Sequence, residues 1–587
     1  MPETTVGREV VQIVELRQPR CARVYGTAPC TATGAGDEKC FNTRVTCQVP
    51  AAFSLGTPLS LFFSRGGVAD KVPGVPYIIP SLVSVSTAPS QINLAGSNLD
   101  GQGLGSRAVC NITFMDHAHS DRVVDPYKEE RSWDALSGAR GSFWTRWRAR
   151  NQYRQNVVIN VYEGYAGQTL GEMVKRTYFL QSITPPNAGG QVTLTGKDIL
   201  SRLEERKAQI PIASPGRRPA PLTTASFSDF TATNCVIADY PSSGYLRIDK
   251  ECFYYSGRNQ FNANTVQFTG VQRAVLGTVA ATHDTDAVVQ SVYRFTGQTV
   301  ADAYRNVLRD YGNIPESWMD YANWVIEGST YLTGYQLYGY ITEPTSVSQI
   351  ISEISIQTLS YLWWDERAAL IKMKAVRGAD VLPPLLTEEL NIVEDSFSLQ
   401  EMPRERASQV WIYYGQRTPV EGAEDAKNYK QLAINANLES ETDELYGEPS
   451  IRKIFARFLT STAIIDSVAS KTITRYVDIP HACEFMLDAK DRQYWVGDSV
   501  RISHHLDVKP DGTRLVRTWL ITSAEEVVPG ELVRYRAEDT SLYGLIYYVM
   551  ANGAADYPGP GLGPEKHCYI GNNQGLLSDG TPCGRIS

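Results

Sequence analysis

The segment CARVYGTAPCTATGAGDEKCFNTRVTC, residues 21–47, contains four of the ten cysteines in the chain, and the other six are scattered singly. The four are Cys21, Cys30, Cys40 and Cys47. A thiolate is a soft, anionic ligand, and four thiolates on one short, turn-forming segment are what a tetrahedral zinc ion or an iron–sulfur cluster requires. This segment is therefore predicted to fold around a metal centre.

Two other interpretations of the four cysteines stay open, namely two disulfides or four unrelated buried thiols. Disulfides need an oxidising compartment and hence an export signal. The first twenty residues, MPETTVGREVVQIVELRQPR, place charges throughout and lack the apolar run of about 7–15 residues that a signal peptide carries. No window reaches the roughly 18 apolar residues of a membrane span. These features favour folding in a reducing cytoplasm, and therefore favour metal.

The spacing of the cysteines bears on the identity of the metal. Zinc sites usually pair their cysteines in CxxC turns, whereas the gaps here are eight, nine and six residues. Long gaps wrap a larger object more easily, and four-thiolate ligation of an iron–sulfur cube tolerates varied loops. The spacing leans towards a [4Fe-4S] cluster, with zinc as the second choice.

The composition indicates a folded, multidomain β protein. A chain of 587 residues with a net charge of −8 and 42% hydrophobic residues is neither disordered nor a nucleic-acid-coating protein. Its 32 tyrosines against 17 phenylalanines, together with many Thr and Val, suit half-exposed strands and broad polar-rimmed interfaces. We expect a mainly β fold with some α structure.

Pattern changes along the chain divide it into six parts. They are a metal module (1–60), a first β-barrel (61–205), a small β domain (206–295), an α+β middle domain (296–385), a second β-barrel (386–550) and an extended C-terminal tail (551–587).

Helix signals cluster in the middle domain. Thr299 with Asp302, and Ser346 with Gln349, form capping boxes ahead of apolar stripes, so a helix is predicted to begin at each. A third, short helix is predicted over Ile451 to Leu459 and a strand over Thr472 to Val477.

Catalytic constellations are weak, and the chain is not predicted to be an enzyme. No HExxH, GxSxG, Walker or GxGxxG motif occurs in the required context. The acids and histidines of 116–121 are more simply solvated than metal-bound. His504 and His505 fall in a strand, so their side chains should point to opposite faces and not act on one atom. His481 lies near Cys483, but a buried structural cysteine explains the pair better than a thiol nucleophile.

A basic, aromatic run has two interpretations. Arginines interleaved with aromatic rings can hold phosphates and stack on bases, which would ease the passage of DNA through a pore. The simpler explanation is that they neutralise acids just upstream, such as Asp125 and Glu129, and stack on rings at a subunit contact. The arginines of the candidate DNA-channel or interface patch are Arg140, Arg146, Arg148, Arg150 and Arg154.

The cysteine segment resembles the four-cysteine module of tail-tip proteins of long-tailed bacteriophages and related gene transfer agents. The likeness is carried by CARVYGTAPC at 21–30 and KCFNTRVTCQ at 39–48, and extends more weakly to Gly196-Lys-Asp198-Ile-Leu200 and Trp495-Val-Gly-Asp498. In the lambda-type members, four cysteines hold an iron–sulfur cluster near the C-terminus. Here the module leads the chain instead.

By this resemblance the chain would be a structural tail-tip or baseplate hub protein of the virion, assembled in the host cytoplasm. It would form a homotrimer with two similar barrels per chain. Its partners would be the distal tail protein, the tail tube protein, the tape measure protein and the central fibre or receptor-binding protein, and phage DNA would pass through transiently. The alternatives are a receptor-binding tail spike or a tail-associated cell-wall hydrolase.

Overall fold

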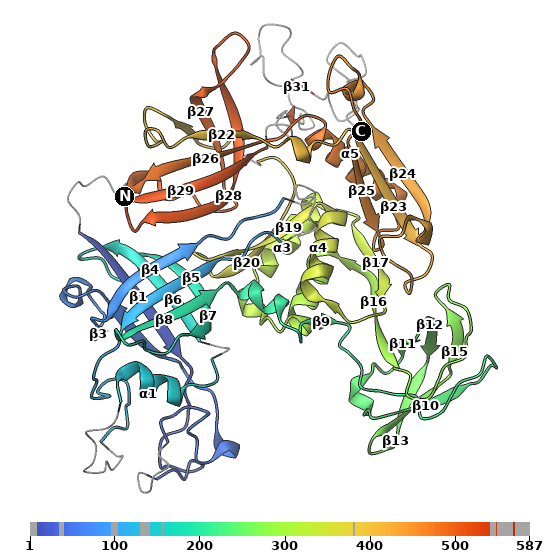
Figure 1. The fold of residues 1–587 in the computed structure, drawn as a ribbon, viewed down its shortest axis with the longest axis horizontal. Coiled ribbons are helices and arrows are strands. Elements are labelled where there is room, and N and C mark those ends of the chain that lie inside the picture. Colours follow the sequence, from blue (N-terminus) through green and yellow to red (C-terminus); the bar gives the residue numbers. More distant parts are fainter. Residues whose placement is uncertain are drawn as a thin grey trace, which may run out of the picture.

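The computed structural model describes residues 9–33, 40–94, 104–129, 141–154, 157–379 and 382–540, with two short strands beyond them. Those two strands, β30 (Tyr547–Tyr548) and β31 (Cys568–Tyr569), pair in parallel. The expected tail at 551–587 otherwise lies outside the described residues. Strands make up most of the regular structure and form several separate sheets (Figure 1), which confirms the mainly β, multidomain fold. None of the helices in the described chain is both long and apolar enough to cross a bilayer.

The N-terminal sheet has eight strands and curls back on itself. Its edge strands are consecutive in the chain, because only Pro80 and Ser81 separate them, and Ser81 O accepts from Met115 N on the next strand in from one edge. In spatial order the strands are β3 (Ile78–Ile79), β2 (Leu59–Ser64), β1 (Val10–Gln18), β6 (Val158–Tyr165), β7 (Val174–Ile183), β8 (Gln191–Lys197), β5 (Val109–Met115) and β4 (Leu82–Ala88).

Alternating burial explains why these segments form strands. In β8, for example, Val192, Leu194 and Gly196 are buried while the residues between them are partly or fully exposed, as expected for a sheet with one face on a core. That core includes Phe63, Phe114 and Trp144. Strand β1, which the sequence analysis grouped with the cysteines, pairs with both β2 and β6. The cysteine segment is therefore a long connection between β1 and β2.

A second long connection leaves the sheet at the end where β1 finishes. It joins β5 to β6 and contains helix α1 (Phe143–Arg150). Because Arg17 near the end of β1 lies opposite Val158 at the start of β6, the start of the first connection lies beside the end of the second. Figure 1 shows both below the sheet.

The next part of the chain forms a small β unit around Phe230, Phe253 and Phe268. One of its sheets contains β10 (Asp229–Thr233), β14 (Thr265–Thr269) and β13 (Gly257–Asn262). The other contains β15 (Gln272–Val275), β12 (Glu251–Tyr255), β11 (Gly244–Ile248), β16 (Gln290–Thr299) and β17 (Gln336–Ile341). The long strand β16 continues directly into the helical middle of the chain.

Both predicted capping boxes begin helices. Thr299 accepts a hydrogen bond from Asp302 N at the start of α2 (Val300–Asn306), which a π-helical turn extends to Tyr311 before Gly312. Ser346 accepts from Gln349 N at the start of α4 (Val347–Thr358). The remaining elements here are α3 (Tyr321–Tyr331), the hairpin β19 (Ser360–Asp365) with β20 (Leu370–Ala375), and the pair β9 (Gln209–Ile210) with β18 (Thr345–Ser346).

The C-terminal part contains two sheets. One runs β21 (Leu385–Thr387), β27 (Ser499–Val508), β28 (Arg514–Val528), β29 (Leu532–Asp539), β26 (His481–Asp488) and β22 (Ser398–Glu401), again with edge strands that are consecutive in the chain. The other runs β24 (Tyr429–Ala436), β23 (Gln409–Gln416) and β25 (Ile451–Ala456), and α5 (Thr462–Tyr476) packs on it.

Two local predictions in this region are wrong. The segment predicted as a short helix, Ile451 to Leu459, begins as strand β25, in which buried and exposed residues alternate. The segment predicted as a strand, Thr472 to Val477, lies at the end of α5, where Thr472 Oγ1 donates to Val468 O one turn earlier. In both cases short apolar runs fit either periodicity, and tertiary pairing decided between them.

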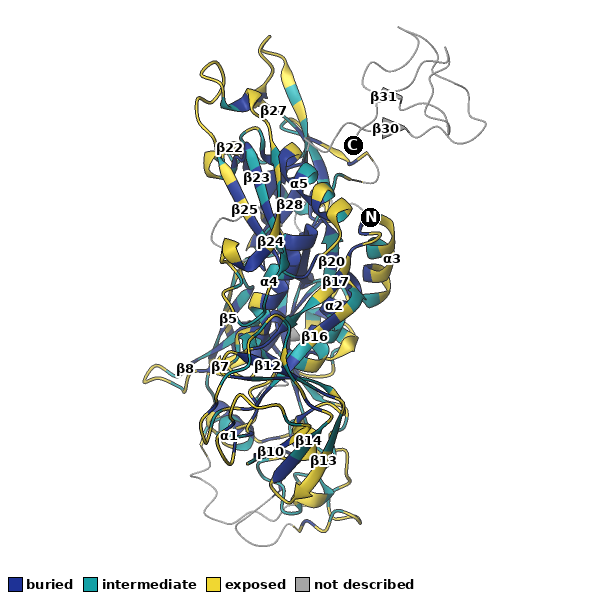
Figure 2. Cartoon of the chain, turned by 90° about the vertical axis from the view of Figure 1, so that its right-hand side faces the viewer, coloured by how far each residue is buried: buried dark blue, intermediate teal, exposed yellow. Residues whose placement is uncertain are grey.

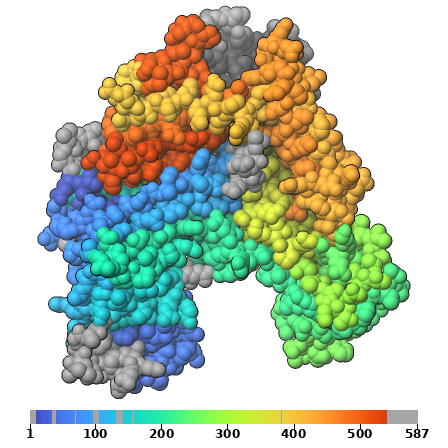
Figure 3. Space-filling model, in the orientation of Figure 1, coloured from blue at the N-terminus to red at the C-terminus, as the bar shows by residue number. Residues whose placement is uncertain are grey.

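The two curled sheets pack directly against each other. Tyr165 Oη in β6 donates to Gly530 O at the β28–β29 turn over 2.6 Å, and Ile92 N donates to Thr522 O over 2.8 Å. Buried Arg176 of β7 pairs with Glu163 at 2.7 Å and with Glu526 of β28 at 3.3 Å. Buried residues accordingly concentrate along the middle of the molecule (Figure 2). The cysteine segment with α1 and the small β unit lie below it, with an open notch between them (Figure 3).

Candidate metal module and its arginine-bearing helix

The connection between β1 and β2 places all four predicted cysteine ligands on irregular, turn-rich backbone. Cys21 N donates to Asn42 O over 2.8 Å, which holds the Cys21 arm beside the Cys40 arm. Thr33 N donates to the Gln48 side chain over 3.0 Å, which ties the arm after Cys30 to the arm after Cys47. The fold thus brings the four cysteines into one module, although residues 34–39 lie outside the described chain.

Two of the sulfurs accept backbone amide hydrogen bonds. Arg23 N points at Cys21 Sγ over 3.5 Å, and Asn42 N points at Cys40 Sγ over 3.4 Å, in each case from two residues further along the chain. Asn42 reaches this position with a φ of +59°, a left-handed conformation that asparagine tolerates. Amide donors favour the charged form of the group that accepts them, so this backbone suits thiolates.

The sulfurs are neither cross-linked nor tightly gathered. Among the described residues no disulfide joins the four cysteines. Around one zinc ion, with bonds of about 2.3 Å, four sulfurs would lie about 3.8 Å apart. Within the described chain, the one group of three or more potential ligand side chains with ligand atoms within 4.8 Å of one another is elsewhere, at Glu388, His504 and His505. The donor set fits an iron–sulfur centre or zinc in chemistry.

Helix α1, which carries the predicted arginines, is capped from a distance. Asp116, directly after β5, accepts from Trp144 N over 3.0 Å through Oδ1 and from Ser142 Oγ through Oδ2. A carboxylate at a helix N-terminus satisfies free amides and complements the helix dipole. The 116–121 segment therefore caps the helix. The prediction that its acids are solvated is correct only in part, because Asp121 is buried.

Two predicted arginines bind Asp121. Arg146 Nη1 and Arg150 Nη2 both donate to Asp121 Oδ2, over 2.7 and 2.9 Å. Burial alone would raise the pKa of this carboxyl, but the hydrogen bonds from His119 and Arg150 and the charges of both arginines outweigh it, and the pKa falls to about 2. Among the described residues, the acid that binds both arginines is Asp121, which lies upstream of Asp125 and Glu129, the acids named from the sequence.

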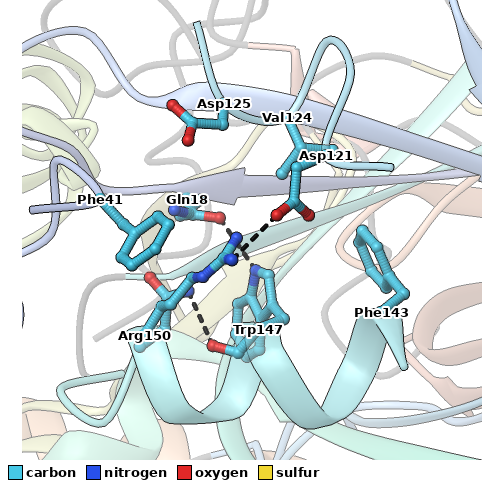
Figure 4. A pocket seen from close by; sticks show the side chains of 9 residues that line it. Gln18, Phe41, Asp121, Val124, Asp125, Phe143, Trp147 and Arg150 are labelled. Atoms are coloured by element: carbon cyan, nitrogen blue, oxygen red, sulfur yellow. Dashed lines mark hydrogen bonds and ion pairs between the residues drawn. The ribbon is translucent and has the colours of Figure 1, made fainter. Parts of the chain in front are cut away.

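The same helix reaches the cysteine module and the sheet. Arg150 lies over the ring of Phe41, next to Cys40, 3.9 Å from the centroid. Trp147 Nε1 donates to Gln18 Oε1, at the end of β1, over 2.9 Å. Figure 4 shows Arg150 between Asp121 and Phe41, with Trp147 turned towards Gln18. The helix thus locks the module against the end of the sheet.

The other predicted arginines differ from Arg146 and Arg150 in their contacts. Within the described residues neither Arg148 nor Arg154 has an acidic partner, although Arg154 Nε donates to Asn151 O over 3.0 Å. Burial, and then the charge of Arg148, lowers the pKa of Arg154. Arg140 lies outside the described residues. The structure therefore assigns Arg146 and Arg150 to internal contacts and leaves Arg148 and Arg154 as the candidates for an external anion.

Burial argues against a nucleophilic role for Cys483. Cys483 is buried, and burial raises the pKa of its thiol well above the ordinary value, which suppresses the thiolate that a nucleophile needs. Burial, and then the charge of Arg517, lowers the pKa of the neighbouring His481.

Sequence reasoning missed one cluster. The prediction that His504 and His505 point to opposite faces is wrong, because both side chains meet Glu388 Oε2, at 3.3 and 2.5 Å. The register of β27 on β28 shifts between Ser503 and Val508, and an irregular strand does not alternate its side chains. The adjacent histidines were visible in the sequence, but their acidic partner, more than a hundred residues away, was not.

No protein-family model and no curated protein matches the chain. Solved structures resemble it at low identity. The tail protein from Neisseria meningitidis MC58 has 11% identity and a TM-score of 0.37 over 78% of this chain and 93% of that chain. The 43 kDa tail protein of prophage MuSo2 from Shewanella oneidensis has 10% identity and a TM-score of 0.34 over 78% and 97%. A chain of the virion of a native gene transfer agent particle has 14% identity and a TM-score of 0.29 over 58% and 91%. Scores this low do not establish a common fold.

Proposed function

We propose that this chain is a structural protein of a bacteriophage tail tip or baseplate, and that it acts there as a hub. The observation that carries the proposal is the direct, polar packing of two curled sheets against each other. Two barrel-like units per chain would let three chains form a pseudo-sixfold ring between a tail tube and a central fibre. The sequence resemblance of the cysteine module to tail-tip proteins supports the same role.

In this proposal Cys21, Cys30, Cys40 and Cys47 hold a [4Fe-4S] cluster that stiffens the module. The amide hydrogen bonds to Cys21 and Cys40 suit thiolate ligands, and the long sequence gaps between the four cysteines suit a larger centre than zinc. Metal–thiolate bonds contribute directly to folding free energy. Such a cross-link would supply rigidity without disulfides, which fits assembly in the host cytoplasm before the particle meets the outside.

The proposed partners follow from the hub role. They are two further copies of the chain, the distal tail, tail tube and tape measure proteins, and the central fibre or receptor-binding protein. Arg148 and Arg154 would face either passing DNA or a neighbouring subunit. We propose a non-enzymatic role, because the sequence has no HExxH, GxSxG, Walker or GxGxxG motif in the required context and the thiol of Cys483 is buried. A receptor-binding spike and a cell-wall hydrolase remain the competing functions.

Particles from the producing strain test the proposal. Gold-labelled antibody raised against this chain should decorate one end of the tail in electron micrographs, and light scattering on the purified protein should give the mass of a trimer. Label at the tips of side fibres would favour the spike, and clearing of a cell-wall zymogram would favour the hydrolase. Particles that carry no label would rule out a virion role.

A further inference from the structure

One cluster of ligand-type side chains lies far from the cysteine module, in the C-terminal sheet. Glu388 Oε2 is 3.3 Å from His504 Nε2 and 2.5 Å from His505 Nδ1. The three side chains present one carboxylate oxygen and two imidazole nitrogens within 4.8 Å of one another. The proposed hub function does not use this cluster.

The topology of the sheet explains why these residues meet. Strand β21 runs parallel to β27 with Thr387 opposite Ser503, so Glu388 and His504 follow at neighbouring positions. The register shift after Ser503 then turns His505 to the same side, and the two imidazole rings lie 4.4 Å apart at 30°. A backbone irregularity that redirects one side chain is common next to functional sites.

The surroundings hold the three groups in place. Arg514 of β28 binds Glu388 through Oε1 and binds Glu389 as well, which leaves Oε2 towards the histidines. The ring of His504 stacks on Phe397, 4.2 Å between centroids, and its side chain is 9% exposed. Hydrogen-bonded partners behind the ligands orient many metal sites in this way. The side chain of His505 is 62% exposed, so solvent reaches the cluster from one side.

We propose that Glu388, His504 and His505 bind a divalent transition-metal ion such as Zn²⁺. Two imidazole nitrogens and one carboxylate oxygen form a ligand set that zinc accepts, with water in the fourth position. Leu506 N now points at His504 Nδ1 over 3.2 Å. Coordination through Nε2 places the proton on Nδ1, so this contact opens when the ion binds. The bound ion would fasten the short edge strand β21 to the β27–β28 hairpin.

Zinc counting on the intact protein tests the site. Full-length wild type, with its cysteine module as isolated, and the variants Glu388→Gln and His505→Ala are dialysed against Zn²⁺, and bound zinc is measured by mass spectrometry. His481→Asn, in the same sheet but outside the cluster, is the matched control. We expect wild type and the control to bind one more ion per chain than either variant, with affinity reduced by at least about tenfold in the variants.

Cobalt separates this site from the thiols. Co²⁺ bound by nitrogen and oxygen gives visible d–d bands without sulfur charge transfer, and these bands should disappear in both variants. Since His505 is exposed, His505→Ala should keep the circular dichroism spectrum of wild type. Equal zinc in wild type and both folded variants would overturn the proposal, and so would an equal loss in His481→Asn.

Discussion

Arg150 lies with its guanidinium over the ring of Phe41, 3.9 Å from the centroid, and so joins a helix after β5 to a cysteine module after β1. The same guanidinium binds Asp121 over 2.9 Å. The side chain is 14% exposed, so both contacts are largely removed from water. One arginine therefore joins the two connections through residues that lie more than a hundred positions apart in the sequence.

Replacement of Arg150 should loosen the module. Arg150→Ala removes a cation–π contact that is partly desolvated and one of the two ion pairs of Asp121, and we expect a loss of roughly 1–2 kcal/mol in the free energy of unfolding. Urea denaturation followed by tryptophan fluorescence measures it. Arg122→Ala, an exposed arginine on the same connection, is the control. Equal stability of the two variants would mean that the contacts with Phe41 and Asp121 contribute little.

Acid should weaken the same connection through Asp121. The folded-state pKa of this carboxyl is about 2, below its ordinary value near 4, because hydrogen bonds from His119 and Arg150 and two positive charges outweigh the effect of burial. A depressed acid pKa stabilises the fold above the unfolded-state pKa, and this stabilisation is lost as pH falls from about 4 to about 2.

The variant Asp121→Asn tests this dependence. It should be less stable than wild type at pH 7, and the difference in urea midpoint should shrink between pH 4 and pH 2.5. Asp70→Asn, at an exposed position in the same curled sheet region, should leave the midpoint unchanged at every pH. A difference between Asp121→Asn and wild type that stays constant with pH would contradict the assignment.

Local signals in the sequence predicted the elements that depend on neighbouring residues. The capping boxes at Thr299 and Ser346 begin helices because a side chain oxygen reaches an amide three residues away, and nothing distant is needed. The four cysteines likewise share one connection between β1 and β2 because they lie within 27 residues of the chain. Such features follow from spacing alone.

Features that depend on distant pairing could not be predicted. Strand β1 continues a sheet across the whole cysteine segment, and its partner β6 begins 140 residues after β1 ends. The partner of Arg146 and Arg150 is Asp121, which the sequence could not distinguish from nearer acids. The meeting of His504 with His505 depends on a register shift, which has no local signature in this chain.

Glu366 should make stability depend on pH with the opposite sign. It lies at the contact between the N-terminal sheet and the middle of the chain. It follows β19, where its backbone oxygen accepts from Thr177 N of β7 over 2.9 Å, and its side chain is buried. Burial raises its pKa to about 7, and the charge of Arg176 offsets this only in part. A carboxyl with a raised pKa binds its proton more tightly in the fold, so stability is lost as pH rises from about 4.5 to about 7.

Glu366→Gln should therefore stabilise the protein at pH 8 by on the order of 2–3 kcal/mol and have little effect at pH 4. Thermal unfolding across this range measures the difference. Glu129→Gln, at a side chain 91% exposed, should change neither value. Destabilisation by Glu366→Gln at pH 8 would indicate that the charged form is the one that the fold binds, through Arg176.

The last prediction concerns the proposed [4Fe-4S] cluster of the cysteine module. Cys40 is buried, unlike the other three cysteines of the module, and its sulfur accepts from Asn42 N, so loss of this thiol removes a ligand and an amide contact together. Protein purified without oxygen should carry about four iron atoms per chain and absorb visible light through sulfur-to-iron charge transfer. Cys40→Ser should lose both and become more sensitive to protease around residues 21–47. Cys235→Ala, which removes a thiol that donates to Ala232 O in the small β unit, should keep them. If Cys40→Ser retained the iron content of wild type, the cluster could not depend on these four cysteines, and zinc in place of iron in the wild type would reassign the metal but keep the module.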